Sequence, residues 1–179
     1  MKYFFDTEFI EDGKTIDLIS IGIVAEDGRE FYAVNANMPE KRIRKHEWLM
    51  ENVVPHLPQG HGDWKNHMPK RWLFDHSDHR VKERKAIRRE VRDFLLADGN
   101  PELWAWFSAY DHVVLAQLFG TMMDLPDGIP MYTNDVRSLV DWTGVYVLPN
   151  QAGSAHDALD DARHVKQMYD HIIRTSGRP

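Results

Sequence analysis

Alternating and continuous runs of hydrophobic residues dominate the N-terminal part of the chain, and both patterns are typical of strands. Three such runs occupy residues 2–9, 16–25 and 30–35. The segments between them contain Asp12-Gly13 and Asp27-Gly28, and Asp-Gly pairs favour tight hairpin turns. The sequence therefore predicts an antiparallel meander of three strands.

The hydrophobic period lengthens to three or four residues in the second half of the chain, which indicates helices. Over 80–96, Ile87, Val91 and Leu95 share one face, so a helix is expected there. The last helix is expected to begin at Asp157, a favourable N-cap, and to extend to about Ile173. The elements expected between these two helices are a strand over 103–107, a helix after Asp111, a strand over 131–135 and a helix over 136–142.

Residues 37–79 follow neither pattern well. Pro39 is expected to begin an amphipathic helix that extends through Met50. From Val54 to Asp78 the chain combines prolines, glycines and histidines, and no histidine pair there has the i, i+4 spacing typical of a zinc site on a helix. We interpret this segment as a solvated loop rather than as a metal site.

The meander followed by alternating strands and helices predicts an α/β fold. Its mixed sheet would consist of the antiparallel meander and then βα units, with helices packed on it, as in ribonuclease H-like folds. A length of 179 residues and a hydrophobic content of 42% fit one domain with a real core. We expect a single domain over 1–179 with an inserted helix and loop region at about 37–79.

The composition excludes several kinds of chemistry. The chain has no cysteine, so disulfides, thiolate zinc sites and cysteine nucleophiles are excluded. No stretch reaches the roughly 20 apolar residues of a membrane span. We therefore expect a cytoplasmic protein that does not interact with a membrane.

The net charge of −6 is unevenly distributed. Residues 80–92 contain seven basic and two acidic residues, a net of +5, which leaves −11 for the rest of the chain. Such a run is either a solvated helix face or a surface that binds backbone phosphates. The candidate phosphate contacts are Arg84, Arg88, Arg89 and Arg92.

Two carboxylates stand two residues apart in the first strand. Asp6 and Glu8 would point to the same face, where two like charges need a cation or a proton to be tolerated. The alternative is a strand that ends at Phe5, with both acids solvated in a turn. Which alternative holds depends on whether other carboxylates reach the same place.

Further candidates occur later in the chain. Asp111 lies at a strand-to-helix junction, where open α/β sheets place functional groups. His156 lies just before the last helix and Asp161 one turn inside it; the alternative is that the acids only favour the helix dipole and the histidine is a surface residue. With Asp6 and Glu8, these acids would form an oxygen-rich site suited to two Mg²⁺ ions, or Mn²⁺, and to phosphodiester cleavage. A neutral imidazole at His156 could then accept a proton from the attacking water.

These motifs have the order and spacing of a known nuclease family. Asp6-x-Glu8, then Tyr110-Asp111, then His156 with four residues before Asp161 resemble the three motifs of the DEDDh 3′–5′ exonucleases. Within that superfamily, the stretches Tyr-Phe-Phe-Asp-Thr-Glu-Phe-Ile-Glu-Asp-Gly, Glu-Leu-Trp-Ala-Trp and Ala-Tyr-Asp-His resemble the small actinobacterial exoribonucleases. Those enzymes act on poly(A) or on 3′ single-stranded overhangs of duplex RNA.

The resemblance implies a role for each motif residue. Asp6, Glu8 and Asp161 would hold one Mg²⁺ ion, and Asp6 with Asp111, through water, would hold the second. Glu8 and His156 would be catalytic, with His156 as general base, and the product would be a 5′-nucleoside monophosphate. The resemblance also implies RNA 3′ ends as substrate and a homodimer. The expected substrate contacts near the cleaved end are Thr7, Phe9, Tyr110 and Trp106.

Two positions depart from the superfamily pattern. Phe9-Ile10 stands where many members have Thr-Gly, and Phe107 stands where many have Asn, so the substrate preference follows less directly than the chemistry. Phe9, Trp104 and Trp106 could stack on a base, although core packing is the simpler account of the two tryptophans. An RNA exonuclease, a DNA exonuclease of the proofreading or repair type and a non-catalytic nucleic-acid-binding module all stay open. All five positions of the predicted catalytic site hold residues able to do the chemistry, which argues against the non-catalytic module.

Overall fold

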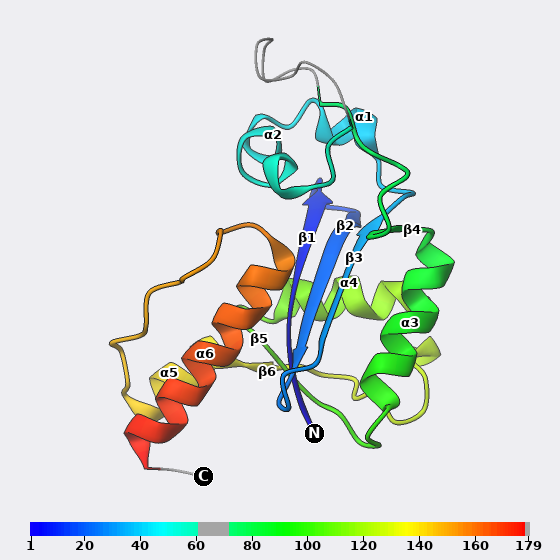
Figure 1. Ribbon diagram of the computed structural model, residues 1–179. Helices are drawn as coiled ribbons and strands as arrows, with labels where there is room; N and C mark the ends of the chain where they lie inside the picture. Colours follow the sequence, from blue (N-terminus) through cyan, green and yellow to red (C-terminus); the bar gives the residue numbers. More distant parts are fainter. Residues whose placement is uncertain (61–71, 178–179) are drawn as a thin grey trace.

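The computed structural model describes residues 1–60 and 72–177 of the chain. A six-stranded mixed sheet with the strand order β4-β3-β2-β1-β5-β6 forms its centre (Figure 1). The strands are β1 (Lys2–Glu11), β2 (Ile16–Ala25), β3 (Glu30–Asn35), β4 (Val81–Lys82), β5 (Glu102–Ala105) and β6 (Asn134–Asp135). The first three pair antiparallel and the others join parallel, which confirms the expected α/β fold with its initial meander.

Helices cover both faces and one end of this sheet (Figure 1). The helices are α1 (Glu40–Ile43), α2 (Glu47–Asn52), α3 (Arg84–Leu96), α4 (Ala109–Phe119), α5 (Val136–Thr143) and α6 (Ala158–Ser176), with 3₁₀ turns at Val54–His56 and Met122–Asp124. None of the helices within the described ranges has both the length and the apolar character that crossing a bilayer requires.

The alternation of side chains along β1 assigns its residues to the two faces. Tyr3 and Phe5 pack in one cluster with residues of α3 and α4, whereas Phe4 packs with α5 and α6. Because successive strand residues point to opposite faces, Asp6 continues the face of Phe4, toward α6, and Thr7 points toward α4. The register shifts after Glu8, so the regular alternation ends where the two acids have been placed.

A glycine in β2 lets α6 approach the sheet closely. Gly22 pairs with Asp6, and a Cβ at Gly22 would lie 2.3 Å from the carbonyl oxygen of Ala158 and 2.5 Å from Cα of Leu159. Only a residue without a side chain fits there, because real Cβ contacts are never this short. The N-terminal turn of α6 therefore rests directly on the sheet beside Asp6.

Residues of the predicted inserted region cover the end of the sheet. Ile43 of α1 and Leu49 of α2 pack in one cluster with Ile10 of β1 and Val34 of β3 (Figure 1). This packing holds α2 over the end of β1, next to the loop that leads into α6. His61 and His67, part of the segment interpreted as a solvated loop, lie outside the described residues.

Several element boundaries differ from the prediction. β1 extends to Glu11, and α4 begins at Ala109, so Asp111 lies in its first turn rather than before it. The helix expected from 80 begins at Arg84, because Val81 and Lys82 pair with β3 as β4. The single helix expected from Pro39 to Met50 is two short helices, and His46 caps the second by accepting a hydrogen bond from the Leu49 amide at 3.3 Å. The shortened strands are β5, which ends at Ala105, and β6, which covers only Asn134–Asp135.

Candidate active site

A cleft of about 620 Å³ lies between β1, the start of α4 and the N-terminal part of α6. All four predicted carboxylates and His156 line it. No lysine or arginine is among the described residues that form its wall. The complete lining is Asp6, Thr7, Glu8, Phe9, Trp106, Phe107, Tyr110, Asp111, Leu148, Gln151, Ala155, His156, Asp161, His164, Val165 and Met168.

Asp6 and Glu8 lie where a negative charge is unfavourable, and the pKa values of both are raised. Glu8 is only 8% exposed, and burial, followed by the charges of Asp161 and Asp111, raises its pKa to about 8. Burial and the neighbouring carboxylates, Asp111 first, also raise the pKa of Asp6 well above its ordinary value. Both acids thus resist ionisation unless positive charge is supplied nearby.

Asp111 is held in place by β1. It lies in the first turn of α4, and its Oδ1 accepts hydrogen bonds from the amide of Thr7 at 2.9 Å and from the Thr7 hydroxyl at 2.6 Å. Burial raises the pKa of Asp111 to about 6, although the two bonds from Thr7 act in the opposite direction. Because Thr7 faces α4 while Asp6 faces α6, one strand segment joins acids that come from the two sides of the sheet.

Asp161 is fixed by the loop that precedes α6. Its Oδ2 accepts a hydrogen bond from the His156 amide at 2.8 Å, and its Oδ1 accepts one from the side-chain amide of Gln151. Asp157 is the N-cap of the helix and accepts from the amides of Leu159 and Asp160, as expected. Burial raises the pKa of Asp161, and the two hydrogen bonds it accepts only partly oppose this.

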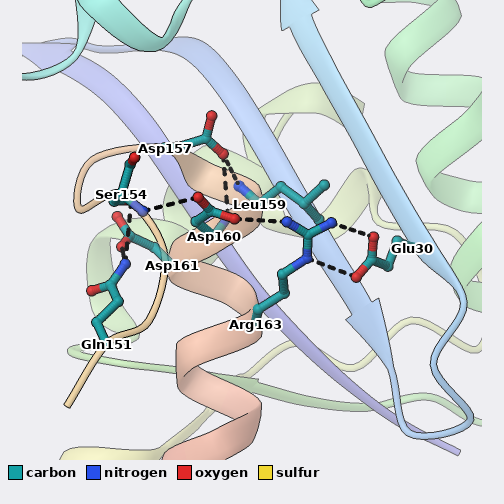
Figure 2. A network of polar contacts seen from close by, with 8 residues as sticks. All are labelled: Glu30, Gln151, Ser154, Asp157, Leu159, Asp160, Asp161 and Arg163. Carbon is teal, nitrogen blue, oxygen red and sulfur yellow. Dashed lines mark hydrogen bonds and ion pairs between the residues drawn. The ribbon is translucent and has the colours of Figure 1, made fainter.

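The acid next to Asp161 in the sequence has different surroundings (Figure 2). Asp160 accepts hydrogen bonds from the Ser154 amide at 3.0 Å and from Nη1 of Arg163 at 2.6 Å. Arg163 also binds Glu30 of β3 through Nε at 2.8 Å and Nη2 at 2.6 Å. Asp160 therefore belongs to an ion-pair network on the outer side of α6, and Asp161 belongs to the cleft.

His156 has a strained backbone and a close aromatic neighbour. Its φ is +67°, in the left-handed region that costs a residue other than glycine on the order of 1–3 kcal/mol. The ring of Trp48, from α2, contacts the imidazole edge-on with ring centroids 4.7 Å apart. Single ligand atoms of His156, Glu8 and Asp161 lie within 4.8 Å of one another. A ring nitrogen of this partly buried imidazole thus lies close to both acids.

Aromatic side chains form the other wall of the cleft. Phe9 and Tyr110 stack with centroids 5.7 Å apart and planes 6° from parallel, and Trp106 contacts Phe107 edge-on at 5.1 Å. Phe107 is 60% exposed and has φ +54°. The predicted substrate contacts Thr7, Phe9, Tyr110 and Trp106 all line the cleft. The hydroxyl of Thr7, however, is engaged with Asp111.

The four arginines predicted to contact phosphates lie elsewhere, on α3. Arg84 donates to the carbonyl oxygen of Gln117, near the far end of α4, at 2.7 Å. Arg88, Arg89 and Arg92 line a separate cavity of about 470 Å³ with Lys85, Phe119, Asp124 and Pro126. The structure thus does not bring these arginines into the cleft.

Several lining residues were not identified from the sequence. His164 follows Asp161 by three positions on α6, so the helical period was a sufficient signal for it. Gln151, and Trp48, which contacts His156 without lining the cleft, had no such signal, because both come from segments whose path depends on tertiary packing.

The donor atoms in the cleft suit a divalent cation that prefers oxygen. Four carboxylates converge without a lysine or arginine among the described residues of the lining, and their pKa values are raised by burial and mutual repulsion. A cation would relieve both penalties, and carboxylate oxygens are the ligands that Mg²⁺ and Mn²⁺ prefer. The residues present therefore fit a site for such ions.

Comparison with known proteins gives one family. The model of that family, described as the Rv2179c-like 3′–5′ exoribonuclease domain, matches residues 1–173. Two relatives from Mycobacterium tuberculosis are 3′–5′ exoribonuclease Rv2179c of strain H37Rv and 3′–5′ exoribonuclease MT2234.1 of strain CDC 1551. Each is 44% identical over 177 residues, which cover 98% of this chain and 95% of the relative.

Proposed function

The chain belongs to the Rv2179c-like 3′–5′ exoribonuclease family, and from this premise we propose that it hydrolyses RNA from the 3′ end in the four-carboxylate cleft. The substrate would be a single-stranded tail or a 3′ overhang of duplex RNA. The product would be a 5′-nucleoside monophosphate. The RNA-directed activity follows the family, whereas the ions, the base and the substrate contacts are proposed from the site.

One observation carries the proposal. Asp6, Glu8, Asp111 and Asp161 converge in one cleft, and none of them has a lysine or arginine partner among the described residues of the lining. Acids kept only for stability are normally solvated or ion-paired, since an unpaired buried charge is costly. The repulsion among these buried carboxylates is unfavourable while the site is empty, and it would be relieved when cations and a phosphodiester bind.

The carboxylates would hold the two divalent ions. Asp6, Glu8 and Asp161 would bind one ion, and Asp6 with Asp111 the other. When bound, such ions stabilise the charge on the attacking and leaving oxygens of the phosphodiester. Thr7 would keep Asp111 oriented through the two hydrogen bonds that it donates. Gln151 would do the same for Asp161.

His156 would accept the proton of the attacking water. Its imidazole faces Glu8 and Asp161, and its backbone amide is bound to Asp161, so the base is linked directly to an ion-binding acid. The contact with Trp48 limits the orientations of the ring. A group held near the water in a productive orientation needs little reorganisation in the transition state.

Aromatic and basic side chains would hold the RNA. The stacked pair Phe9 and Tyr110, together with Trp106, offers flat apolar surface for the terminal base. The guanidinium groups of Arg84, Arg88, Arg89 and Arg92 would contact phosphates farther from the 3′ end.

A release assay tests this function. RNA and DNA oligomers of one sequence, each labelled at the 5′ end, are incubated with Mg²⁺, with Mn²⁺ and with chelator. The labelled ladder is resolved on a gel, and the released mononucleotides, which carry no label, are identified by chromatography against standards. We expect stepwise shortening of RNA from the 3′ end and release of 5′-monophosphates, with no reaction in chelator. Preferred shortening of DNA would establish the DNA exonuclease instead. Binding without any release would establish the non-catalytic module.

We also propose that the protein is cytoplasmic and that, as the family resemblance implies, it is a homodimer. Light scattering during size-exclusion chromatography is expected to give twice the chain mass of 20.9 kDa. A mass of one chain across a range of concentrations would rule the dimer out.

A further inference from the structure

A second groove lies beside the active-site cleft. Its volume is about 390 Å³, and its walls are the β1–β2 turn over residues 11–16 and one face of α4. Tyr110 lines both cavities, and its stacking on Phe9 forms part of the wall of the cleft. We call this second cavity the turn groove.

The α4 wall of the turn groove is apolar and exposed. Tyr110, Val113 and Gln117 follow one another at i, i+3 and i+7, so they share one face of the helix. Tyr110 is 57% exposed and Val113 is 44% exposed. Exposed flat or branched side chains in a row beside a nuclease cleft suit the faces of successive bases.

The opposite wall supplies an available positive charge. Lys14 is exposed in the turn, and no described side chain forms an ion pair with its ammonium group. The carboxylate of Glu11, on the same wall, keeps its negative charge, but it is directed to the Gly13 amide, from which it accepts a hydrogen bond at 2.6 Å. A phosphate in the groove would therefore meet a cation.

The far end of the turn groove leads to the basic face of α3. Gln117 lines the groove, and its carbonyl oxygen accepts the hydrogen bond from Arg84. Beyond Arg84 lies the cavity whose wall includes Lys85, Arg88, Arg89 and Arg92, with Phe119 of α4 on its other side. The outer face of α4 therefore connects the carboxylates to the arginines that the sequence singled out (Figure 1).

A cavity on the other side of α6 offers a weaker route. It is lined by His79, Arg80, Lys82 and Arg163, among others. Its three strong cations already have carboxylate partners, namely Asp78 for Arg80, Glu90 for Lys82 and Glu30 for Arg163. A phosphate would have to displace these acids, whereas Lys14 has none to displace.

We infer that the turn groove binds the nucleotides that precede the 3′-terminal dinucleotide, in a single RNA strand that continues to the basic face of α3. This inference rests on the proposed function, because it assumes that an RNA 3′ end occupies the cleft. The seven-residue step from Tyr110 to Gln117 spans about 10 Å at 1.5 Å per residue. That rise matches about three stacked nucleotides at 3.4 Å each. Val113 contacts their bases and Lys14 one of their phosphates.

Substrates of two lengths test the groove. Val113→Asp and Lys14→Gln are compared with Arg174→Gln, which removes the same charge as Lys14→Gln but lies in the last turn of α6, far from the groove. Steady-state kinetics are measured on a dinucleotide, which fills only the cleft, and on an octanucleotide. The octanucleotide assay is repeated over a range of salt concentrations.

We expect the losses to be confined to the octanucleotide. Val113→Asp should raise its KM by roughly tenfold, because an apolar contact with a base is lost and a negative charge is added beside the phosphates. Lys14→Gln should reduce the slope of log affinity against log salt by about 0.7, the value for one phosphate contact on a single strand. The Arg174→Gln variant should match the wild type on both substrates.

Three outcomes would overturn the inference. Equal losses on both substrates would mean that the variants disturb the cleft, and wild-type kinetics on the octanucleotide would mean that the strand leaves by another route. A loss in Arg174→Gln equal to that in Lys14→Gln would mean that net charge, not the groove, is responsible. A wild-type protein that cleaves neither substrate would instead contradict the proposed function, so the two failures are distinguishable.

Discussion

The two sides of the first turn of α6 show how differently one protein treats adjacent acids. On the outer side, Asp160 and Glu30 share Arg163, and the guanidinium lowers the pKa of Glu30 (Figure 2). On the inner side, Asp161 faces Glu8, whose pKa is raised to about 8, and no lysine or arginine is among the described residues of the cleft wall. The charges of the outer acids are therefore balanced within the protein, whereas those of the inner acids have no lysine or arginine in the described lining of the cleft to balance them.

The contrast teaches that acidity alone does not identify a site. Asp157, Asp160 and Asp161 are equivalent as letters in the sequence, yet one caps the helix, one forms an ion pair and one faces the cleft. The surroundings decide. Asp157 accepts the amides of a helix N-terminus and Asp160 binds a guanidinium, whereas Asp161, although it also accepts two amide hydrogen bonds, lies among other carboxylates without a lysine or arginine in the described lining of the cleft. A carboxylate partly buried among other carboxylates, without a cationic partner, is what indicates binding of an external cation.

The largest effect is expected from replacing Asp161, the acid on the inner side of α6. Asp161→Asn should abolish RNA hydrolysis, because a neutral amide is a poor ligand for a divalent ion. Asp160→Asn, its matched control one residue away, should retain most activity. Turnover of an RNA oligomer in Mg²⁺ is the measurement, and comparable activity of the two variants would contradict the division of roles. Asp6→Asn and Glu8→Gln should behave like Asp161→Asn, with the fold intact by circular dichroism.

The next effect concerns the base on the inner side. His156→Ala should lose about 10²–10⁴-fold in kcat, the usual contribution of general-base catalysis. Its affinity for Mn²⁺, followed by calorimetry, should stay near normal, since the imidazole is not proposed as a ligand. The acidic limb of the wild-type pH–rate profile should shrink in the variant. Loss of ion binding together with activity would show that His156 is a ligand instead.

Much of this arrangement could be predicted from the sequence. The i, i+2 spacing of Asp6 and Glu8 and the N-cap signal at Asp157 are local rules, and local rules place both motifs on their elements. The position of Asp111 after a strand, together with the family resemblance of the three motifs, predicts that it lies with them. These inferences needed no knowledge of packing.

The rest depends on tertiary contacts that no local pattern encodes. Gly22 admits the N-terminal turn of α6 against the sheet, but the sequence does not say which helix it admits. Trp48 reaches His156 only because α2 packs over the end of β1. Residues 80–83 have a helical pattern, yet pairing with β3 overrides that preference, which moves the basic helix to Arg84.

The repulsion among the inner acids should also be visible in the stability of the protein once divalent ions are removed. Glu8 has a folded-state pKa of about 8 against an ordinary 4.5, so the folded state holds this proton more tightly than the unfolded state does. The free energy of unfolding in chelator should therefore fall as the pH rises from about 4.5 to 8, by on the order of a few kcal/mol. Mg²⁺ should restore stability at pH 8. Glu8→Gln should flatten this dependence, and wild-type protein equally stable at both pH values in chelator would contradict it.

The smallest expected effect lies on the outer side of α6. Arg163→Gln breaks the ion pairs with Glu30 and Asp160, but both acids are partly exposed and become solvated once the guanidinium is gone. Exposed ion pairs contribute about 0–1 kcal/mol, so urea denaturation should show a loss within that range. RNA hydrolysis should stay within about twofold of wild type, because Asp161 keeps its bonds from Gln151 and His156. A loss of activity close to that of Asp161→Asn would mean that the outer network positions the inner acids, and the two sides of α6 would then act as one site.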